Sequence, residues 1–134
     1  MLSVTDAILD TSVLLAFALD ERHDVNPDTL LSGAAVSTVS LAEFRSRLLL
    51  KQVAVEDIDA TLHDFNLKLL PFGPEEAELA GNLIPIARPL NIGLGDCASI
   101  ATGIAHGRTI WTADRDWLKL EAPGADIQLI RNQP

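Results

Sequence analysis

The chain of 134 residues has a single cysteine, few basic side chains and no long apolar run. Cys97 alone excludes an internal disulfide and a cysteine-based zinc site. The longest apolar run, Val13 to Leu19, is far too short to span a membrane, and the N-terminus lacks the basic segment that opens a signal peptide. These absences predict a cytoplasmic protein with no membrane segment.

Basic residues are outnumbered by acidic ones, ten against nineteen, which gives a formal net charge of −9. This balance argues against nucleic-acid binding through bulk positive charge, but it leaves room for local basic contacts around an acidic site. Hydrophobic residues make up 48% of the chain and charged residues 22%, as in globular proteins. Without a repeat, low-complexity tract or linker, one domain over residues 1–134 is expected.

Short apolar segments alternate with segments of helical character. Each apolar segment is about the length of a buried strand, and an alternation of strands and helices predicts a parallel sheet covered on both faces. Pro85 is expected to end or kink its helix, and Gly107 to stop the next one. The strands are expected at 7–9, 34–37, 67–72, 108–112 and 127–131. The helices are expected at 13–19, from 27, at 40–51, at 55–66, from 74 and from 96.

Five carboxylates occupy positions that such a sheet would bring together. Asp10 ends the first strand, and Asp114 and Asp116 follow the strand at 108–112. Glu43 lies one helical turn after the second strand, and Asp96 begins a helix behind a glycine turn. The carboxyl ends of parallel strands share one edge, where open α/β sheets bind ligands. A carboxylate cluster at that edge would suit Mg²⁺ or Mn²⁺, which prefer oxygen ligands.

Each carboxylate also has a structural interpretation. Asp10 can cap the helix that follows it, and Glu43 can pair with Ser40 in a capping box. Asp96 is favourable at a helix N-terminus, and the two acids after the strand at 108–112 can simply occupy a turn. The functional interpretation therefore depends on the whole set converging in space.

Four short motifs resemble those of PIN-domain ribonucleases, and their order and spacing resemble the VapC toxins of bacterial toxin–antitoxin pairs. They are Leu9–Leu15, Ser40–Phe44, Leu94–Ala98 and Thr112–Trp117. The resemblance covers almost the whole chain. It departs from the usual pattern at Trp117, where phenylalanine is common, and this change should be tolerated as packing.

The resemblance implies a three-layer α/β/α sandwich with a parallel five-stranded sheet. It also implies an endoribonuclease that depends on Mg²⁺ or Mn²⁺ and hydrolyses RNA phosphodiester bonds. The acidic, metal-binding site would contain Asp10, Glu43, Asp96 and Asp114, with Asp116 close enough to assist. The hydroxyl groups that would support these acids belong to Thr11, Ser12 and Thr112.

The same resemblance implies partners. A VapB-type antitoxin would bind the chain over apolar grooves, with the helices at 13–19 and 55–66 as candidate surfaces, and a homodimer is expected. Arg115 and Arg47 are candidates for RNA contacts. An ordinary ion pair between Glu43 and Arg47, one helical turn apart, is the alternative for Arg47.

Other carboxylate enzymes fit less well. A haloacid-dehalogenase-like phosphatase needs a second acid where this chain has Ser12, and neither a phosphate-binding loop nor a complete dinucleotide fingerprint is present. The main alternative is a catalytically silent PIN-like module that binds RNA or protein, since a fold does not dictate an activity. Retention of the acid set favours the nuclease.

Overall fold

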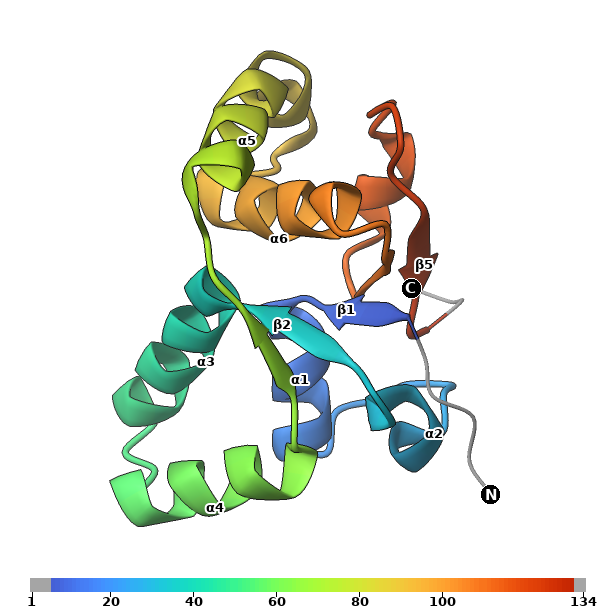
Figure 1. The fold of residues 1–134 in the computed structure, drawn as a ribbon. Coiled ribbons are helices and arrows are strands. Elements are labelled where there is room, and N and C mark those ends of the chain that lie inside the picture. Colours follow the sequence, from blue (N-terminus) through green and yellow to red (C-terminus); the bar gives the residue numbers. More distant parts are fainter. Residues whose placement is uncertain (1–5, 132–134) are drawn as a thin grey trace.

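The computed structural model describes residues 6–131, in which strands and helices alternate (Figure 1). None of the helices in this range is long and apolar enough to cross a membrane. The strands are β1 (Ala7–Leu9), β2 (Ala35–Ser37), β3 (Lys68–Leu70), β4 (Thr109–Thr112) and β5 (Ile127–Leu129). The α-helices are α1 (Thr11–Ala18), α2 (Pro27–Leu31), α3 (Thr38–Leu50), α4 (Val55–Phe65), α5 (Pro74–Ala87) and α6 (Leu94–Ala105). Two short 3₁₀ helices are η1 (Arg88–Leu90) and η2 (Arg115–Lys119).

The strands form one five-stranded sheet in the order β3-β2-β1-β4-β5, and all neighbours are parallel. In the register of the central pair, Ile8 of β1 lies opposite Ile110 of β4. Figure 1 shows α5 and α6 on one face of this sheet, and α1, α3 and α4 on the other. The predicted α/β/α sandwich with a parallel five-stranded sheet is therefore confirmed.

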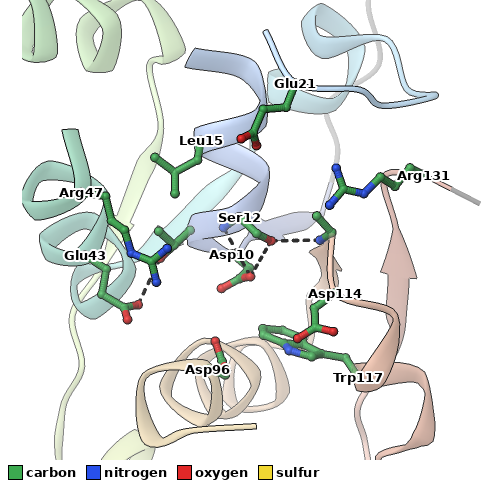
Figure 2. A pocket seen from close by; sticks show the side chains of 12 residues that line it. Asp10, Ser12, Leu15, Glu21, Glu43, Arg47, Asp96, Asp114, Trp117 and Arg131 are labelled. Carbon is green, nitrogen blue, oxygen red and sulfur yellow. Dashed lines mark hydrogen bonds between the residues drawn. The ribbon is translucent and has the colours of Figure 1, made fainter. Parts of the chain in front are cut away.

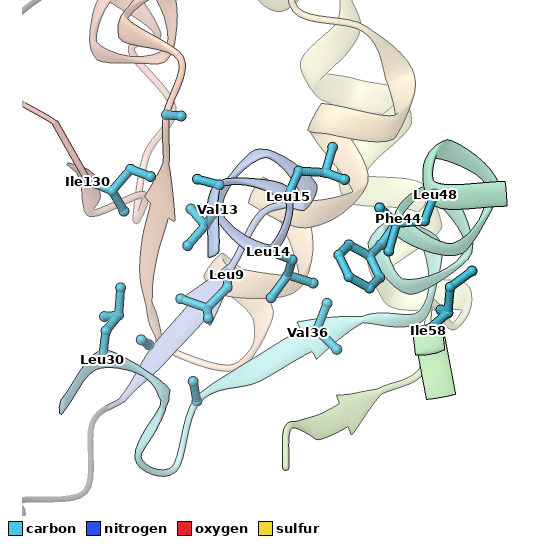
Figure 3. Close-up of a cluster of buried hydrophobic side chains, with 14 residues drawn as sticks. Leu9, Val13, Leu14, Leu15, Leu30, Val36, Phe44, Leu48, Ile58 and Ile130 are labelled. Atoms are coloured by element: carbon cyan, nitrogen blue, oxygen red, sulfur yellow. The ribbon is translucent and has the colours of Figure 1, made fainter. Parts of the chain in front are cut away.

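Alternate side chains of β1 enter two different cores, as the period of a strand requires. Leu9 packs with Val36, Phe44 and other apolar groups of α1, α3 and α4 (Figure 3). Ile8 points to the opposite face and packs against α5 and α6. Both side chains are fully buried, so β1 is fixed between two helical layers and the residue that follows it is held firmly.

Several helix boundaries differ from the sequence prediction. Helix α3 begins at Thr38 with Ser37 as its N-cap, so the predicted start at Ser40 is wrong. Helix α5 does not end at Pro85 but continues to Ala87. Proline removes the N–H that would bond the carbonyl four residues earlier, at Gly81, and both residues are exposed, so water can replace that bond.

Candidate active site

The carboxyl end of β1 is the point at which the order of strand addition reverses. The chain builds β2 and β3 on one side of β1, and β4 and β5 on the other. Open α/β sheets bind ligands at such a switch point. A pocket with a cavity volume of about 340 Å³ lies there (Figure 2). It is lined by Asp10, Thr11, Ser12, Leu15, Glu21, Glu43, Arg47, Asp96, Ala113, Asp114, Trp117 and Arg131.

Asp10 lies at the bottom of this pocket and is only 4% exposed. Its Oδ2 accepts hydrogen bonds from Ser12 Oγ at 2.8 Å and Thr112 Oγ1 at 3.1 Å. The backbone N–H of Ser12 donates more weakly, at 3.4 Å, which makes Asp10 the N-cap of α1. The same hydroxyls accept from the N–H groups of Ala113 and Asp114, at 2.9 and 3.1 Å. This network fixes the start of α1 to the end of β4.

Glu43 reaches the pocket from the second turn of α3 and is not part of a capping box. Ser40, its expected partner, lies inside the helix, and its Oγ has no hydrogen-bond partner among the described residues. Glu43 Oε1 instead accepts a hydrogen bond from Thr11 Oγ1 at 3.1 Å. A Cβ at Gly95 would lie 2.7 Å from Glu43 Oε2, so glycine is what allows the carboxylate to approach the first turn of α6.

Asp96 combines the two interpretations that the sequence left open. It is the third residue of α6, and its Oδ2 accepts a hydrogen bond from the Gly93 N–H at 3.2 Å. This is a helix-capping contact of the kind that the structural interpretation requires. Asp96 also lines the pocket opposite Asp10, as Figure 2 shows. Capping therefore positions Asp96 at the pocket and does not divert it.

The two acids after β4 behave differently. Asp114 lines the pocket, and its Oδ1 accepts from the Asp116 N–H at 2.9 Å, which caps η2. Asp116 does not line the pocket, and its carboxylate pairs with Lys119 at 3.2 Å. Arg115 is exposed and is likewise not among the lining residues. Four of the five predicted acids thus share one pocket, and Asp116 lies outside it.

Burial and mutual repulsion act on the acids of this pocket. Burial raises the pKa of Asp10 to about 6, and the charge of Asp96 adds to the rise against the opposing hydrogen bonds. Burial also raises the pKa of Asp96, although the Gly93 N–H lowers it. The charges of Glu43 and Asp114 raise this pKa further. The pocket therefore concentrates negative charge at a place that disfavours it.

Sequence reasoning missed several residues that line the pocket. Glu21 follows α1 in a polar loop, and Arg131 follows β5, so neither belongs to a recognisable motif. Leu15 and Trp117 form its apolar walls. Trp117 is 1% exposed, which agrees with its predicted packing role. Leu15 and Trp117 lie in the first and fourth motifs, so the sequence carried a signal for these two, whereas Glu21 and Arg131 had none.

Residues 7–123 match the sequence profile of the PIN domain. The chain belongs to the PIN domain family. The resemblance predicted from the four motifs is therefore confirmed, and the acidic pocket lies within the matched range. Among curated proteins, none matches this PIN domain at a significant level.

Solved VapBC structures share the fold of this PIN domain. VapBC2 from Rickettsia felis, bound to a DNA fragment from their promoter, is 19% identical, with a TM-score of 0.72 over 92% of this chain and 97% of that one. VapBC from Salmonella typhimurium, also bound to DNA, is 17% identical, with a TM-score of 0.70 over 95% and 98%. VapBC-5 from Mycobacterium tuberculosis is 24% identical, with a TM-score of 0.64 over 95% and 99%.

The pocket of this PIN domain offers the donors that a hard divalent cation prefers. Four of its five carboxylates, those of Asp10, Glu43, Asp96 and Asp114, repel one another, and a cation bound to their oxygens would relieve this repulsion. Within residues 6–131, however, no three acidic, histidine or cysteine side chains are arranged so that they could already hold one ion. The donor chemistry therefore fits Mg²⁺ or Mn²⁺, while the side chains would have to draw together around it.

Proposed function

We propose that this PIN domain is an endoribonuclease of the VapC type, which hydrolyses RNA phosphodiester bonds at the acidic pocket. One observation carries the proposal: four carboxylates from four separate segments line one pocket, where burial raises the pKa of two of them. Buried like charges destabilise a fold unless a ligand compensates them, so a purely structural module has no use for them. The four residues are Asp10, Glu43, Asp96 and Asp114.

We assign Mg²⁺ or Mn²⁺ to these four carboxylates, as the sequence resemblance implies, and leave out Asp116 because it pairs with Lys119. Such an ion, when bound, activates water and neutralises charge on a phosphate. The chain itself orients the ligands. Ser12 and Thr112 hold Asp10, Thr11 holds Glu43, and the start of α6 holds Asp96. Hydrogen bonds of this kind fix the direction in which a metal ligand points.

A toxin role completes the proposal, with a VapB-type antitoxin as partner and a homodimer as the resting assembly. Its support is the likeness in fold to VapBC structures. Helix α1 is mostly buried, so core packing explains it and it offers little surface to a partner. Helix α4 borders an apolar cleft lined by Leu41, Leu62, Leu67 and Leu69, and Leu69 is 54% exposed. We assign the antitoxin to this cleft.

The decisive experiment is cleavage of total RNA by the purified protein in Mn²⁺ or Mg²⁺, with EDTA as the metal-free arm. Asp10→Asn should abolish cleavage, because Asp10 is the most buried acid of the pocket. Asp116→Asn is the matched control and should cleave like the wild type. Full activity of Asp10→Asn would overturn the site assignment, and mapped cleavage sites would identify the RNA. Co-expression of a small neighbouring protein that binds the chain and suppresses cleavage would support the toxin role.

A catalytically silent module that binds RNA or protein is the second candidate. The observation that favours it is the separation of the carboxylates, which do not form a ready-made ion site within the described residues. RNA binding and RNA cleavage, each measured in EDTA and in Mn²⁺, distinguish the two functions. A silent module would bind RNA or a protein partner with the same affinity in EDTA and in Mn²⁺, and no RNA would be cut under either condition.

A further inference from the structure

Two arginines line the acidic pocket from opposite sides. Figure 2 shows Arg47 on one side of Asp10 and Arg131 on the other. The sheet order explains this placement. Arg47 belongs to α3, which follows β2, whereas Arg131 follows β5, the far edge strand on the other side of β1. The acids of the pocket therefore lie between two cationic groups.

Neither arginine forms an ion pair with these acids in the described residues, although the charge of Arg47 lowers the pKa of Asp96. Within residues 6–131, no carboxylate forms an ion pair with Arg47 or with Arg131, although five acidic side chains line the same pocket. The alternative considered for Arg47, an ion pair with Glu43, is not formed, and Glu43 Oε1 accepts a hydrogen bond from Thr11. A guanidinium carries five N–H donors whose geometry suits a phosphate, so both side chains retain most of their binding capacity.

Arg131 is held in place by the loop that follows α1. Its Nη1 donates to the backbone carbonyl of Arg22 at 3.3 Å. The Asp24 N–H donates to the carbonyl of Ile130 at 2.7 Å, which fastens the same loop to the end of β5. One donor thus orients the guanidinium, while the side chain lines the pocket. An oriented side chain loses less conformational entropy when it binds a phosphate.

We propose that Arg131 and Arg47 bind phosphates on either side of the one that is cleaved, so that a single RNA strand crosses the pocket from α3 to the end of β5. This inference rests on the proposed function and adds a substrate path to it. A polyanion approaching several carboxylates is repelled, and cations on both flanks offset that repulsion where the strand enters and leaves. Arg131 lies in none of the sequence motifs, so this path is a property of the folded chain.

The test compares Arg131→Gln, Arg47→Gln and Arg45→Ala. Glutamine at 131 keeps an amide N–H for the Arg22 carbonyl while removing the charge, so loss of folding is not expected, and melting temperatures check this. Arg45 is the matched control, since it lies on the same helix but pairs with Asp59 at 2.7 Å outside the pocket. Cleavage of a single-stranded RNA oligonucleotide in Mn²⁺ gives kcat and KM, and fluorescence anisotropy in EDTA gives its affinity as a function of NaCl concentration.

Replacement of either pocket arginine by glutamine should raise KM about tenfold with little change in kcat. Removal of one phosphate contact should also reduce the slope of log affinity against log salt by about 0.7. Arg45→Ala should leave both KM and the salt slope unchanged.

The outcomes separate the RNA path from the nuclease activity. If the wild type cleaves RNA but Arg131→Gln retains the wild-type KM and salt slope, the proposed path is wrong and the proposed nuclease activity is retained. If the wild type binds RNA with the expected slopes but never cleaves it, the path stands and the nuclease is wrong. If the wild type neither binds nor cleaves, both are overturned.

Discussion

Thr11 Oγ1 donates a hydrogen bond to Glu43 Oε1 at 3.1 Å, although 32 positions separate the two residues. The same hydroxyl lies 3.3 Å from the carbonyl oxygen of Ser40, a longer contact that shares its single O–H donor. Thr11 is the first residue of α1 and Glu43 projects from α3, so one buried hydroxyl joins the two helices that flank the pocket. The carboxylate of Glu43 is thereby directed toward the pocket and away from the helix end.

Thr11→Val should test this relationship with almost no change in volume. The valine removes the hydroxyl, leaves Glu43 without its donor and should reduce the free energy of unfolding by about 1–2 kcal/mol. RNA cleavage should fall about tenfold, because Glu43 is no longer held in one direction. Thr11→Ser keeps the hydroxyl and is the matched control, for which near wild-type cleavage is expected. Equal activity of the serine and valine variants would show that the bond does not matter for the reaction.

Ser40→Ala and Glu43→Gln together separate a helix cap from an active-site acid. Because Ser40 Oγ is buried and has no partner in the described part of the chain, its loss should be neutral or should stabilise the fold by up to about 1 kcal/mol. Glu43→Gln should reduce cleavage strongly while changing the melting temperature little. Thermal denaturation and RNA cleavage of both variants check this. A large loss of stability in Ser40→Ala would instead support the interpretation of Ser40 as a helix cap.

The convergence of Asp10, Asp96 and Asp114 could be predicted because each of them follows from a local rule. Asp10 and Asp114 follow strands that are neighbours in the sheet, and parallel neighbours end at the same edge. Asp96 lies in the first turn of a helix, as the sequence predicted, although α6 begins at Leu94 and not at Asp96. Such signals extend over a few residues only, which is why they survive without knowledge of the tertiary structure.

Other features depend on contacts between distant segments. Ser37, Thr38 and Ser40 can each cap a helix. Ser37 and Ser40 are both completely buried, but Ser37 is the last residue of β2 and its side chain accepts a hydrogen bond from the Val39 N–H, so the helix begins directly after the strand. Arg131 reaches the pocket only because β5 pairs with β4 and a loop near Arg22 binds its side chain. The residues around these positions do not indicate such distant contacts. The sequence prediction therefore started α3 too late and did not include Arg131 among the residues of the pocket.

The stability of the metal-free protein should depend on pH through Asp10. Its pKa is about 6 in the folded state and near 3.9 in an unfolded chain, so between these values the folded state binds more protons. The free energy of unfolding should therefore fall as the pH rises from about 4 to about 6, by on the order of 3 kcal/mol from this group. Melting in EDTA across this range measures the loss. Asp10→Asn should reduce the slope without removing it, because the raised pKa of Asp96 acts in the same direction. If the pH dependence of stability is the same in Asp10→Asn and in the wild type, the raised pKa of Asp10 is wrong.

The response of the fold to Mn²⁺ should distinguish a shared metal site from an ordinary helix cap. Asparagine at position 96 can still accept the hydrogen bond from Gly93, so the cap survives in Asp96→Asn. The substitution also removes repulsion with Glu43 and Asp114, so the metal-free variant should be at least as stable as the wild type. At ten times the dissociation constant, a bound ion should stabilise the wild type by about 1.4 kcal/mol and the variant clearly less. Asp116→Asn, outside the pocket, should show the full wild-type shift. Melting curves in EDTA and in millimolar Mn²⁺ measure these shifts, and equal shifts in wild type and Asp96→Asn would exclude Asp96 from the metal site.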